Sequence, residues 1–136
     1  MKKSISKLKA ELDKWFSLYV RLKYSNELGM VQCFTCGCVK PYNKGIQNGH
    51  FQSRKHLATR WDEKNCRPQC VGCNMFKAGE QFKFGMNLDA EYGDGTAEHL
   101  QWKARQLTKI ARYEYEEKIG YYKQLVNNLK KEKLLT

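Results

Sequence analysis

Apolar residues recur at steps of three and four in the first part of the chain. Between Ser4 and Gly29 these residues are Ile5, Leu8, Leu12, Trp15, Tyr19 and Leu22. Such spacing predicts an amphipathic helix with one face turned towards a core. Ser4 is a candidate for the N-cap, and Gly29 suits the left-handed position that follows many helices. We therefore expect a helix over the segment 1–28, ending near Gly29.

A second helical pattern occupies the segment 93–136. Gly93 and Gly95 predict a turn, and Thr96 is a candidate cap for the helix that follows. The apolar positions after this turn are Leu100, Ala104, Leu107, Ala111, Tyr115, Ile119, Tyr122, Val126 and Leu129. This pattern predicts one long helix or two. Gly120 is the expected place for a bend or break, because glycine inside a helix costs about 1 kcal/mol relative to alanine.

The segment 29–92 contains all six cysteines, and its first part, MVQCFTCGCVKPYNKG, is short, punctuated by glycine and not helical. Cys33 and Cys36, and again Cys70 and Cys73, form Cys-x2-Cys pairs with a glycine nearby. Each pair matches the tight turn in which two thiolates bind one Zn²⁺, so the four together predict a structural zinc site. A redox dithiol would be expected in a βαβ unit, and an iron–sulfur cluster usually has other cysteine spacings. The other two cysteines are interpreted as spare thiols, although either could replace a neighbour in the site.

Charge points to a polyanionic partner. The formal net charge is +11, and the excess is +4 in residues 1–28, +6 in 29–85 and +1 in 86–136. Clustered Lys and Arg favour phosphate contact through counterion release, so nucleic acid is the first candidate. The sequence has no apolar run of about 18 residues and no secretory leader, so we expect no membrane partner and a cytoplasmic protein. A reducing compartment also disfavours disulfides.

Three residues around the second cysteine pair stand in an order that resembles a known motif. In the stretch NGHFQSRKHLATRWDEKNCRPQCVGCNMFKAG, His50 follows Gly49, Asn65 precedes the pair and Asn74 follows its last cysteine. This order resembles the HNH, or ββα-metal, nuclease motif, with Asn74 in the place of the final histidine. More closely, residues 15–100 resemble the phage NinG (Rap) recombination endonuclease family, whose pattern contains Gly-His-aromatic, Arg-aromatic-Asp/Asn-Glu-x-Asn and Gln-Cys-x2-Cys-Asn.

The resemblance implies a fold and an activity. The fold would be α+β, with a small zinc-stabilised ββα-metal (HNH-like) core at 29–92, flanked in one domain by the N-terminal helix and the C-terminal helical segment. The activity would be that of a metal-dependent, structure-selective DNA endonuclease acting on branched recombination intermediates, such as Holliday junctions, in a bacterial host cell. A symmetric junction would favour paired cuts by a homodimer, with the C-terminal helix as a candidate interface.

Phosphodiester hydrolysis explains why these residue types would be needed. The reaction requires a base that takes a proton from water and a divalent cation that neutralises charge on the phosphate. His50 is the candidate base, because neutral imidazole is available near pH 7. Asn65 is a candidate to hold the loop or orient the imidazole, and the amide oxygen of Asn74 suits Mg²⁺ or Mn²⁺.

Many HNH enzymes carry a second metal ligand where this chain has Gly49. Asp62, Glu63 or His56 of the connecting loop could replace it, and the resemblance favours Asp62, because the NinG pattern has an Asp/Asn-Glu pair at this place.

Basic side chains crowd the same window and are expected to clamp backbone phosphates without reading base sequence. They are Arg54, Lys55, Arg60, Arg67 and Lys77. Two other interpretations stay open. One is a non-enzymatic zinc-containing module that binds nucleic acid, in which His50 and Asn74 only pack or hydrogen-bond. The other is a zinc-held interaction protein whose long C-terminal helix pairs with a partner.

Overall fold

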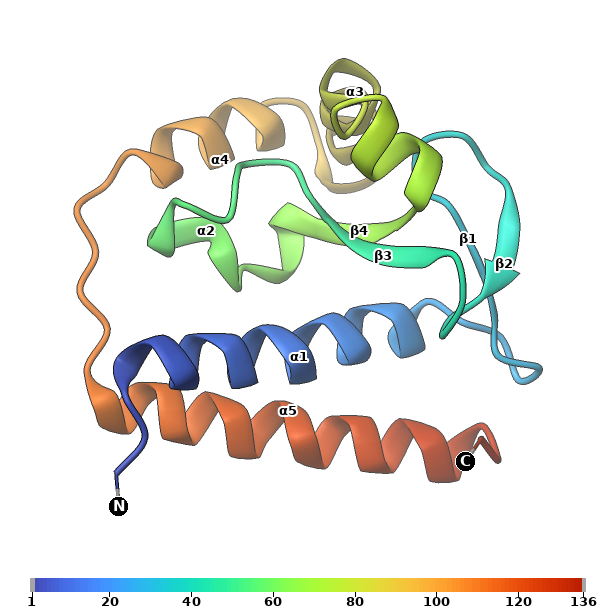
Figure 1. Ribbon diagram of the computed structural model, residues 1–136. Coiled ribbons are helices and arrows are strands. Elements are labelled where there is room, and N and C mark those ends of the chain that lie inside the picture. The colour runs from blue at the N-terminus through green and yellow to red at the C-terminus, as the bar shows by residue number, and fades with distance from the viewer. Residues whose placement is uncertain (1, 136) are drawn as a thin grey trace.

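The computed structural model describes residues 2–135, with helices on both sides of a small β-hairpin (Figure 1). The elements in chain order are α1 (Ile5–Lys23), β1 (Met30–Gln32), β2 (Val39–Pro41), β3 (Ile46–His50), α2 (Leu57–Arg60), η1 (Glu63–Asn65), β4 (Cys66–Cys70), η2 (Gly72–Phe76), α3 (Gln81–Tyr92), α4 (Thr96–Ala104) and α5 (Arg112–Glu132). Helices α1 and α5 lie on one side of the β3–β4 hairpin, and α3 and α4 lie on the other (Figure 1). Among the described residues, no helix is both long and apolar enough to cross a bilayer.

The two long helices run parallel and are tied together at both ends. At their N-terminal ends, Arg112 Nη1 donates to the carbonyl of Lys3 at 2.5 Å. At their C-terminal ends, Lys133 Nζ donates to the carbonyls of Leu22 and Ser25, each at 2.6 Å. The buried side chains between these ends are Leu8, Leu12, Phe16, Tyr19, Val20, Tyr115, Ile119, Tyr122 and Val126. The apolar face of α5 that these side chains form is therefore covered by α1 within the chain.

Helix α1 begins as predicted but ends earlier. Ser4 is its N-cap, with Oγ accepting from the backbone N–H of Lys7 at 3.1 Å. The helix stops at Lys23, six residues short of Gly29. The side chain of Asn26 accepts two backbone N–H groups at 2.9 and 3.0 Å and so stabilises a turn in place of further helix. Gly29 does adopt a left-handed φ of 77°, but within this turn.

The predicted break at Gly120 is wrong. The helical segment divides instead into α4 and α5 at residues 105–111, and Gly120 lies inside α5. Helix α5 starts after Ala111, the N-cap, whose backbone is extended. The N–H of Ala111 donates to Glu114 Oε1 at 3.1 Å, which favours a helix start here. At Gly120 an added Cβ would meet nothing within 4 Å, so this glycine faces open space and disturbs no packing.

The turn before α4 lies where its glycines predict. Gly93 and Gly95 have φ values of 110° and 94°, which only glycine adopts at little cost. The N-cap is Gly95, however, and Thr96 is the first helical residue rather than the cap. The Thr96 hydroxyl donates to the carbonyl of Gly93 at 2.7 Å, so it closes the turn instead of capping the helix.

The β3–β4 hairpin forms the centre of the molecule. The strands are antiparallel, with His50 opposite Cys66 at one end and Ile46 opposite Cys70 at the other. All five residues of β4 are buried. The long connection between these strands carries α2 and η1, and it packs against the helices rather than projecting into solvent.

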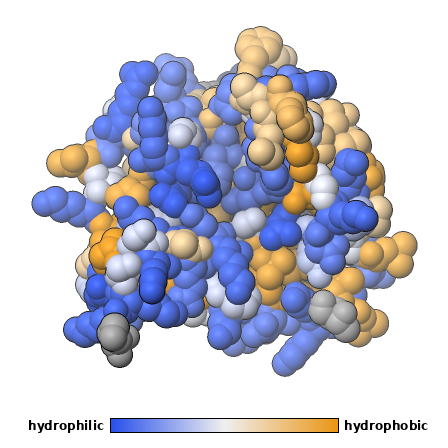
Figure 2. Space-filling view, viewed as in Figure 1, coloured by the Kyte–Doolittle hydropathy of each residue, from blue (hydrophilic) through white to orange (hydrophobic). Residues whose placement is uncertain are grey.

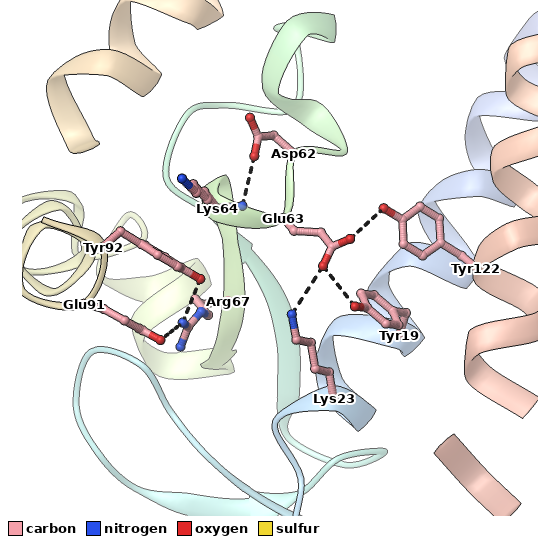
Figure 3. A network of polar contacts seen from close by, with 9 residues as sticks. All are labelled: Tyr19, Lys23, Asp62, Glu63, Lys64, Arg67, Glu91, Tyr92 and Tyr122. Atoms are coloured by element: carbon pink, nitrogen blue, oxygen red, sulfur yellow. Dashed lines mark hydrogen bonds and ion pairs between the residues drawn. The ribbon is translucent and has the colours of Figure 1, made fainter. Parts of the chain in front are cut away.

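Glu63 links that connection to both long helices. Its carboxylate accepts from Tyr19 Oη at 2.9 Å, from Tyr122 Oη at 3.2 Å and from Lys23 Nζ at 3.3 Å (Figure 3). Burial, together with the Glu63 charge, raises the pKa of Tyr19 to about 12. Glu63 thus holds the connection against the α1–α5 pair.

Candidate functional site

The two cysteine pairs meet in space. Cys33 and Cys36 lie at the tip of the β1–β2 hairpin, while Cys70 and Cys73 lie at the end of β4 and in η2. Their four Sγ atoms are all within 4.8 Å of one another, and Cys36 Sγ is 3.7 Å from Cys70 Sγ. Tetrahedral zinc with bonds of about 2.3 Å requires sulfurs about 3.8 Å apart. The four-cysteine cluster could therefore hold a structural zinc ion.

The surroundings of these sulfurs favour a bound cation. The N–H of Cys36 points at Cys33 Sγ at 3.5 Å, and the N–H of Cys73 points at Cys70 Sγ at 3.4 Å. At Cys33 burial opposes ionisation, but such hydrogen bonds outweigh it and lower the pKa to about 6. At Cys73 burial dominates and raises the pKa to about 12. All four sulfurs can be thiolates together only when a cation compensates their charge, which is what zinc supplies when bound.

The two remaining cysteines are outside this cluster. Cys38 is half-buried in the turn that leads into β2. Cys66 is fully buried in β4, and burial raises the pKa of its thiol well above the ordinary value. A buried thiol with a raised pKa is unreactive, so Cys66 acts as a small core residue.

His50 and Asn74 line one open hollow of about 480 Å³. His50 ends β3, and Asn74 lies in η2, the short helix that follows β4. The other residues lining the hollow are Asp13, Ser17, Gln47, Asn48, Arg54, Met75, Ala78, Gly79 and Gln81. Segments far apart in the sequence thus contribute to one polar cavity: α1, β3, the loop after β3, η2 and the start of α3.

One contact settles which nitrogen of His50 is available. Its Nε2 lies 2.9 Å from the carbonyl oxygen of Arg60, which can only accept, so Nε2 carries the proton and Nδ1 keeps a lone pair. Burial lowers the pKa of His50 below its usual 6.5, and the nearby Arg54 charge acts in the same direction. The Arg60 carbonyl, the Asp13 charge and the backbone of Asn48 oppose this shift without reversing it. The imidazole is therefore neutral at pH 7.

Asn65 holds the loop after β3. Its side chain is fully buried, and its Oδ1 accepts from the N–H of Gln52 at 2.7 Å. Its Nδ2 donates to the carbonyls of Gln52 and Thr59 at 3.1 and 3.0 Å. The loop carries Arg60, whose carbonyl positions the His50 ring. Two roles are expected for Asn65: holding the loop and orienting the imidazole. These contacts fit the first role, and any effect on the imidazole is indirect.

The Asn74 side chain is oriented by one neighbour. Its Nδ2 donates to Gln47 Oε1 on β3 at 2.7 Å. Among the described residues nothing donates to Asn74 Oδ1. The amide oxygen is therefore left for a ligand in the hollow, where Asn74 lines the wall.

Asp62 is not brought to Asn74. Its Oδ1 accepts from the backbone N–H of Lys64 at 2.9 Å (Figure 3), and its Oδ2 is paired with Lys103 of α4 at 2.6 Å. It lines a different hollow, between η1 and α4, and not the one that contains His50. The structure thus gives the expected ligand role of Asp62 no geometric support.

Asp13 of α1 lines the His50 hollow and was missed by sequence reasoning. It accepts from Arg60 Nε at 3.1 Å, from Arg60 Nη2 at 2.6 Å and from Trp61 Nε1 at 3.0 Å. It is the only acidic side chain among the described residues that line the hollow. A single carboxylate at the border of the apolar face of α1 is a weak sequence signal, because its partners lie 47 and 48 residues away.

The chain matches one protein family over nearly its whole length. A family model described as bacteriophage lambda NinG protein matches residues 1–132. The chain belongs to the NinG family. No curated protein and no solved structure matches it. The NinG match includes α1 as well as the cysteine cluster, so Asp13 and His50 lie within the same matched region.

Packing explains why this NinG-family chain has glycine at position 49. A Cβ at this buried position would lie 2.0 Å from Gln69 Oε1. Gln69 is itself fully buried and donates to Thr35 Oγ1 at 3.1 Å and to the carbonyl of Gly79 at 2.9 Å. Gln69 thus links the first cysteine pair to the turn after η2. The space where a metal ligand would stand beside His50 is already filled.

The five basic residues expected at the crevice fall into two groups. Arg54, Lys55 and Lys77 are exposed, and Arg54 lines the hollow. The guanidinium of Arg60 is largely covered and paired with Asp13. Arg54 Nη1 lies 3.7 Å from Asp13 Oδ2, but its side chain stays 62% exposed, so it can still meet phosphate, as Lys55 and Lys77 can. Arg60 is engaged within the protein.

Arg67 is also engaged within the protein. Its side chain is only 8% exposed and pairs with Glu91 and with the hydroxyl of Tyr92, 3.0 Å away (Figure 3). The guanidinium also lies 4.0 Å from the ring centroid of Tyr24 and 4.8 Å from that of Phe34. Arg67 therefore joins β4 to α3 and to the residue after α1, and its expected phosphate contact has no support in this arrangement.

Proposed function

We propose that this NinG-family protein is a metal-dependent, structure-selective DNA endonuclease that cleaves branched recombination intermediates such as Holliday junctions. The observation that carries the proposal is that a neutral histidine, a carboxylate and an amide oxygen with no donor among residues 2–135 lie together in one open hollow. A strand hairpin ending in histidine, followed by a short helix bearing the second residue, is also the arrangement implied by the resemblance to HNH nucleases.

His50 acts as the general base in this proposal. Because Nε2–H is donated to the Arg60 carbonyl, Nδ1 is the atom that takes a proton from the attacking water. Burial keeps the ring neutral and ready to accept at pH 7. Asn65 contributes from outside the reaction, since it fixes the loop on which that carbonyl lies.

The residues that would hold a catalytic Mg²⁺ or Mn²⁺ are Asn74, through Oδ1, and Asp13. Both offer the hard oxygen atoms that these ions prefer. When bound, the ion would neutralise charge that develops on the phosphate and on the leaving oxygen. Asp13 already accepts from Arg60 and Trp61, so the protein offers few free ligand atoms. We therefore expect weak metal binding without DNA, with water and substrate phosphate as the remaining ligands.

The proposed DNA contacts are made by exposed basic side chains near the hollow. Arg54 lines the hollow, Lys55 follows Arg54 in the chain, and Lys77 precedes Ala78, which also lines the hollow. These side chains suit contact with backbone phosphates, which positions DNA without reading its sequence. Selectivity for branched DNA would then depend on shape rather than on bases read in a groove.

The test is cleavage of a four-way junction and of a linear duplex with the same sequences in Mg²⁺. The parent protein should cut the junction, and His50→Ala should cut it about 100- to 10,000-fold more slowly at saturating metal. Zinc content and junction affinity should be unchanged in this variant. Asn74→Ala should instead raise the Mg²⁺ concentration that gives half-maximal rate. Equal rates for the parent and His50→Ala would remove His50 from the chemistry.

A non-enzymatic zinc-containing module that binds nucleic acid is the second candidate. The observation in its favour is that the carboxylate of Asp13 is already bound by Arg60 and Trp61. A parent protein that binds the junction but leaves it intact over a range of Mg²⁺ and Mn²⁺ concentrations would establish this alternative.

A further inference from the structure

A ridge of exposed apolar and basic side chains borders the His50 hollow. The apolar rings and chains belong to η2 and to α3, and the exposed fractions of Phe76 and Phe82 are 82% and 83%. Figure 2 shows hydrophobic side chains gathered over the α3 end of the molecule. The ridge consists of Met75, Phe76, Lys77, Phe82, Lys83 and Met86. Phenylalanine rings this exposed contribute little to packing within residues 2–135, and exposed apolar patches commonly mark a binding site.

The backbone between the two phenylalanines is held rigidly. Ala78, Gly79 and Glu80 have φ values of 51°, 81° and 49°, so two non-glycine residues adopt the left-handed conformation. Such residues cost about 1 kcal/mol or more each and persist where surrounding contacts hold them. Here the N–H of Gly79 donates to the carbonyl of Cys73 at 2.8 Å, and Gln69 Nε2 donates to the carbonyl of Gly79 at 2.9 Å. The rings are thus presented from a turn anchored to the cysteine cluster.

The ridge is continuous with the candidate active site. Ala78 and Gln81 line the His50 hollow and also the apolar groove that contains Phe82. Gln81 Nε2 donates to the backbone carbonyl of His50 at 3.3 Å. A strand of DNA whose phosphate lay in the hollow would therefore have its neighbouring nucleotides beside the ridge.

We propose that the ridge receives unstacked bases at the branch point of the DNA, with Phe76 and Phe82 stacking on base faces and Lys77 and Lys83 contacting the adjoining phosphates. This rests on the branched substrate of the proposed function. Exposed aromatic rings flanked by cations are the surface that binds unpaired nucleotides. A linear duplex offers free base faces only at its two ends, so the ridge would select branched over linear DNA.

Charge favours DNA over a second copy of this chain. A two-fold interface places the same patch against itself, which would bring Lys77 and Lys83 of each copy towards those of the other. The phosphates that accompany an unstacked base instead carry the opposite charge. The overall charge of +11 acts in the same direction.

The experiment measures affinity in buffer without divalent cations, so that cleavage plays no part. A four-way junction and a linear duplex are bound by the parent, by Phe82→Ala and by Phe76→Ala. Each substitution should weaken junction binding about 5- to 100-fold, the range for loss of one stacked base, while duplex affinity changes less than about twofold. Phe82→Leu should resemble Phe82→Ala, because it keeps apolar bulk but loses the ring.

Tyr113→Ala is the matched control, since Tyr113 is a 63% exposed aromatic residue on α5, across the molecule from α3 (Figure 1). It should leave both affinities unchanged. Equal junction affinity for the parent and Phe82→Ala would overturn the proposal, as would a parent dimer in sedimentation that Phe82→Ala converts to a monomer. If the parent needs Phe82 to bind the junction but never cuts it, the proposed role of the ridge is supported and the proposed nuclease activity is wrong. A parent that cuts while Phe82→Ala binds normally would remove only the ridge.

Discussion

The four-cysteine cluster and the His50 hollow use the same hairpin in opposite ways. Cys70 ends β4 opposite Ile46, whereas His50 ends β3 opposite Cys66 at the other end of the ladder. The cluster is closed, because its ligand atoms come from two short segments and lie within 4.8 Å of one another. The hollow is open and has walls from α1, β3, η2 and α3.

The difference lies in how completely the polar groups are satisfied. In the cluster, backbone N–H groups already point at the sulfurs of Cys33 and Cys70. In the hollow, Asn74 Oδ1 has no donor among the described residues, and Nδ1 of His50 keeps its lone pair. Groups satisfied within the protein stabilise a fold, and groups left free can bind or react. Changes at the cluster should therefore affect stability first, and changes in the hollow should affect reaction first.

Loss of a cluster cysteine should have the largest effect. Purified protein should contain about one Zn²⁺ per chain, and Cys73→Ser should lose it, because a four-sulfur site with one weak ligand no longer balances its charges. Since binding of a structural zinc is folding free energy, we expect cooperative thermal unfolding to disappear. Zinc content by atomic absorption and unfolding followed by circular dichroism check this prediction.

Cys38→Ser is the control, because Cys38 lies in the turn that carries Cys33 and Cys36 but its sulfur is not one of the four that lie within 4.8 Å of one another. It should keep both zinc and cooperative unfolding. A Cys73→Ser protein that melts like the parent would show that the cluster does not stabilise the fold.

The cluster could be predicted from sequence because its information is local. Two cysteines separated by two residues already imply a chelating turn, and Ser4 likewise caps a helix that begins at the next residue. Local signals failed where two of them competed. Gly29 and Gly120 were expected to end or bend helices, but an Asn26 turn acts before the first, and the second is tolerated on an exposed face.

The hollow could be predicted only in part, since much of it depends on contacts between distant segments. His50 and Asn74 were found through their order around the second cysteine pair. Asp13 comes from a helix whose packing no local pattern specifies. The choice of Asp62 rests on the Asp/Asn-Glu pair that the NinG pattern has in the connecting loop. In space that loop turns the Asp62 carboxylate towards Lys103 of α4. Proximity in sequence was therefore a poor guide to the second carboxylate.

Gly49→Asp should have the next largest effect, and on stability rather than on metal binding. The new Cβ would meet Gln69 Oε1 at 2.0 Å, and the carboxylate would be buried without a donor. We expect a loss of about 3 kcal/mol or more in the free energy of unfolding. Urea denaturation measures this loss, and Mg²⁺ titration of the cleavage rate should show no improvement.

Gly49→Ala combined with Gln69→Ala sharpens the result. If the clash with Gln69 is the cause, the double variant should be more stable than the sum of the two single losses predicts. Additive losses would assign the role of Gly49 to something other than the space that Gln69 fills.

Asp13→Asn should have a smaller effect that falls on the reaction. The substitution keeps the shape of the side chain but removes the charge that holds Arg60, whose carbonyl positions His50. Loss of a supporting partner of this kind typically costs about 10- to 100-fold in activity or metal affinity. Asp62→Asn is the control, because its partner is Lys103 and it lies outside the hollow. If Asp62→Asn slows junction cleavage more than Asp13→Asn, the assignment of the carboxylate is wrong.

The smallest expected effect concerns the pH dependence of cleavage, which protonation of His50 should determine. Burial lowers the pKa of His50 below 6.5, so the cleavage rate at saturating DNA and metal should fall with acid only below pH 6.5. Because the unfolded chain takes up this proton at higher pH than the folded one, stability should also be complete above pH 6.5 and decrease as pH falls below it.

Two substitutions should move the midpoint of the pH dependence of cleavage in opposite directions. Arg54→Gln removes a charge that lowers the pKa, so the midpoint should rise, whereas Asp13→Asn removes a charge that raises it, so the midpoint should fall. A parent midpoint above pH 6.5, or one that neither substitution moves, would show that the titrating base is a group other than His50.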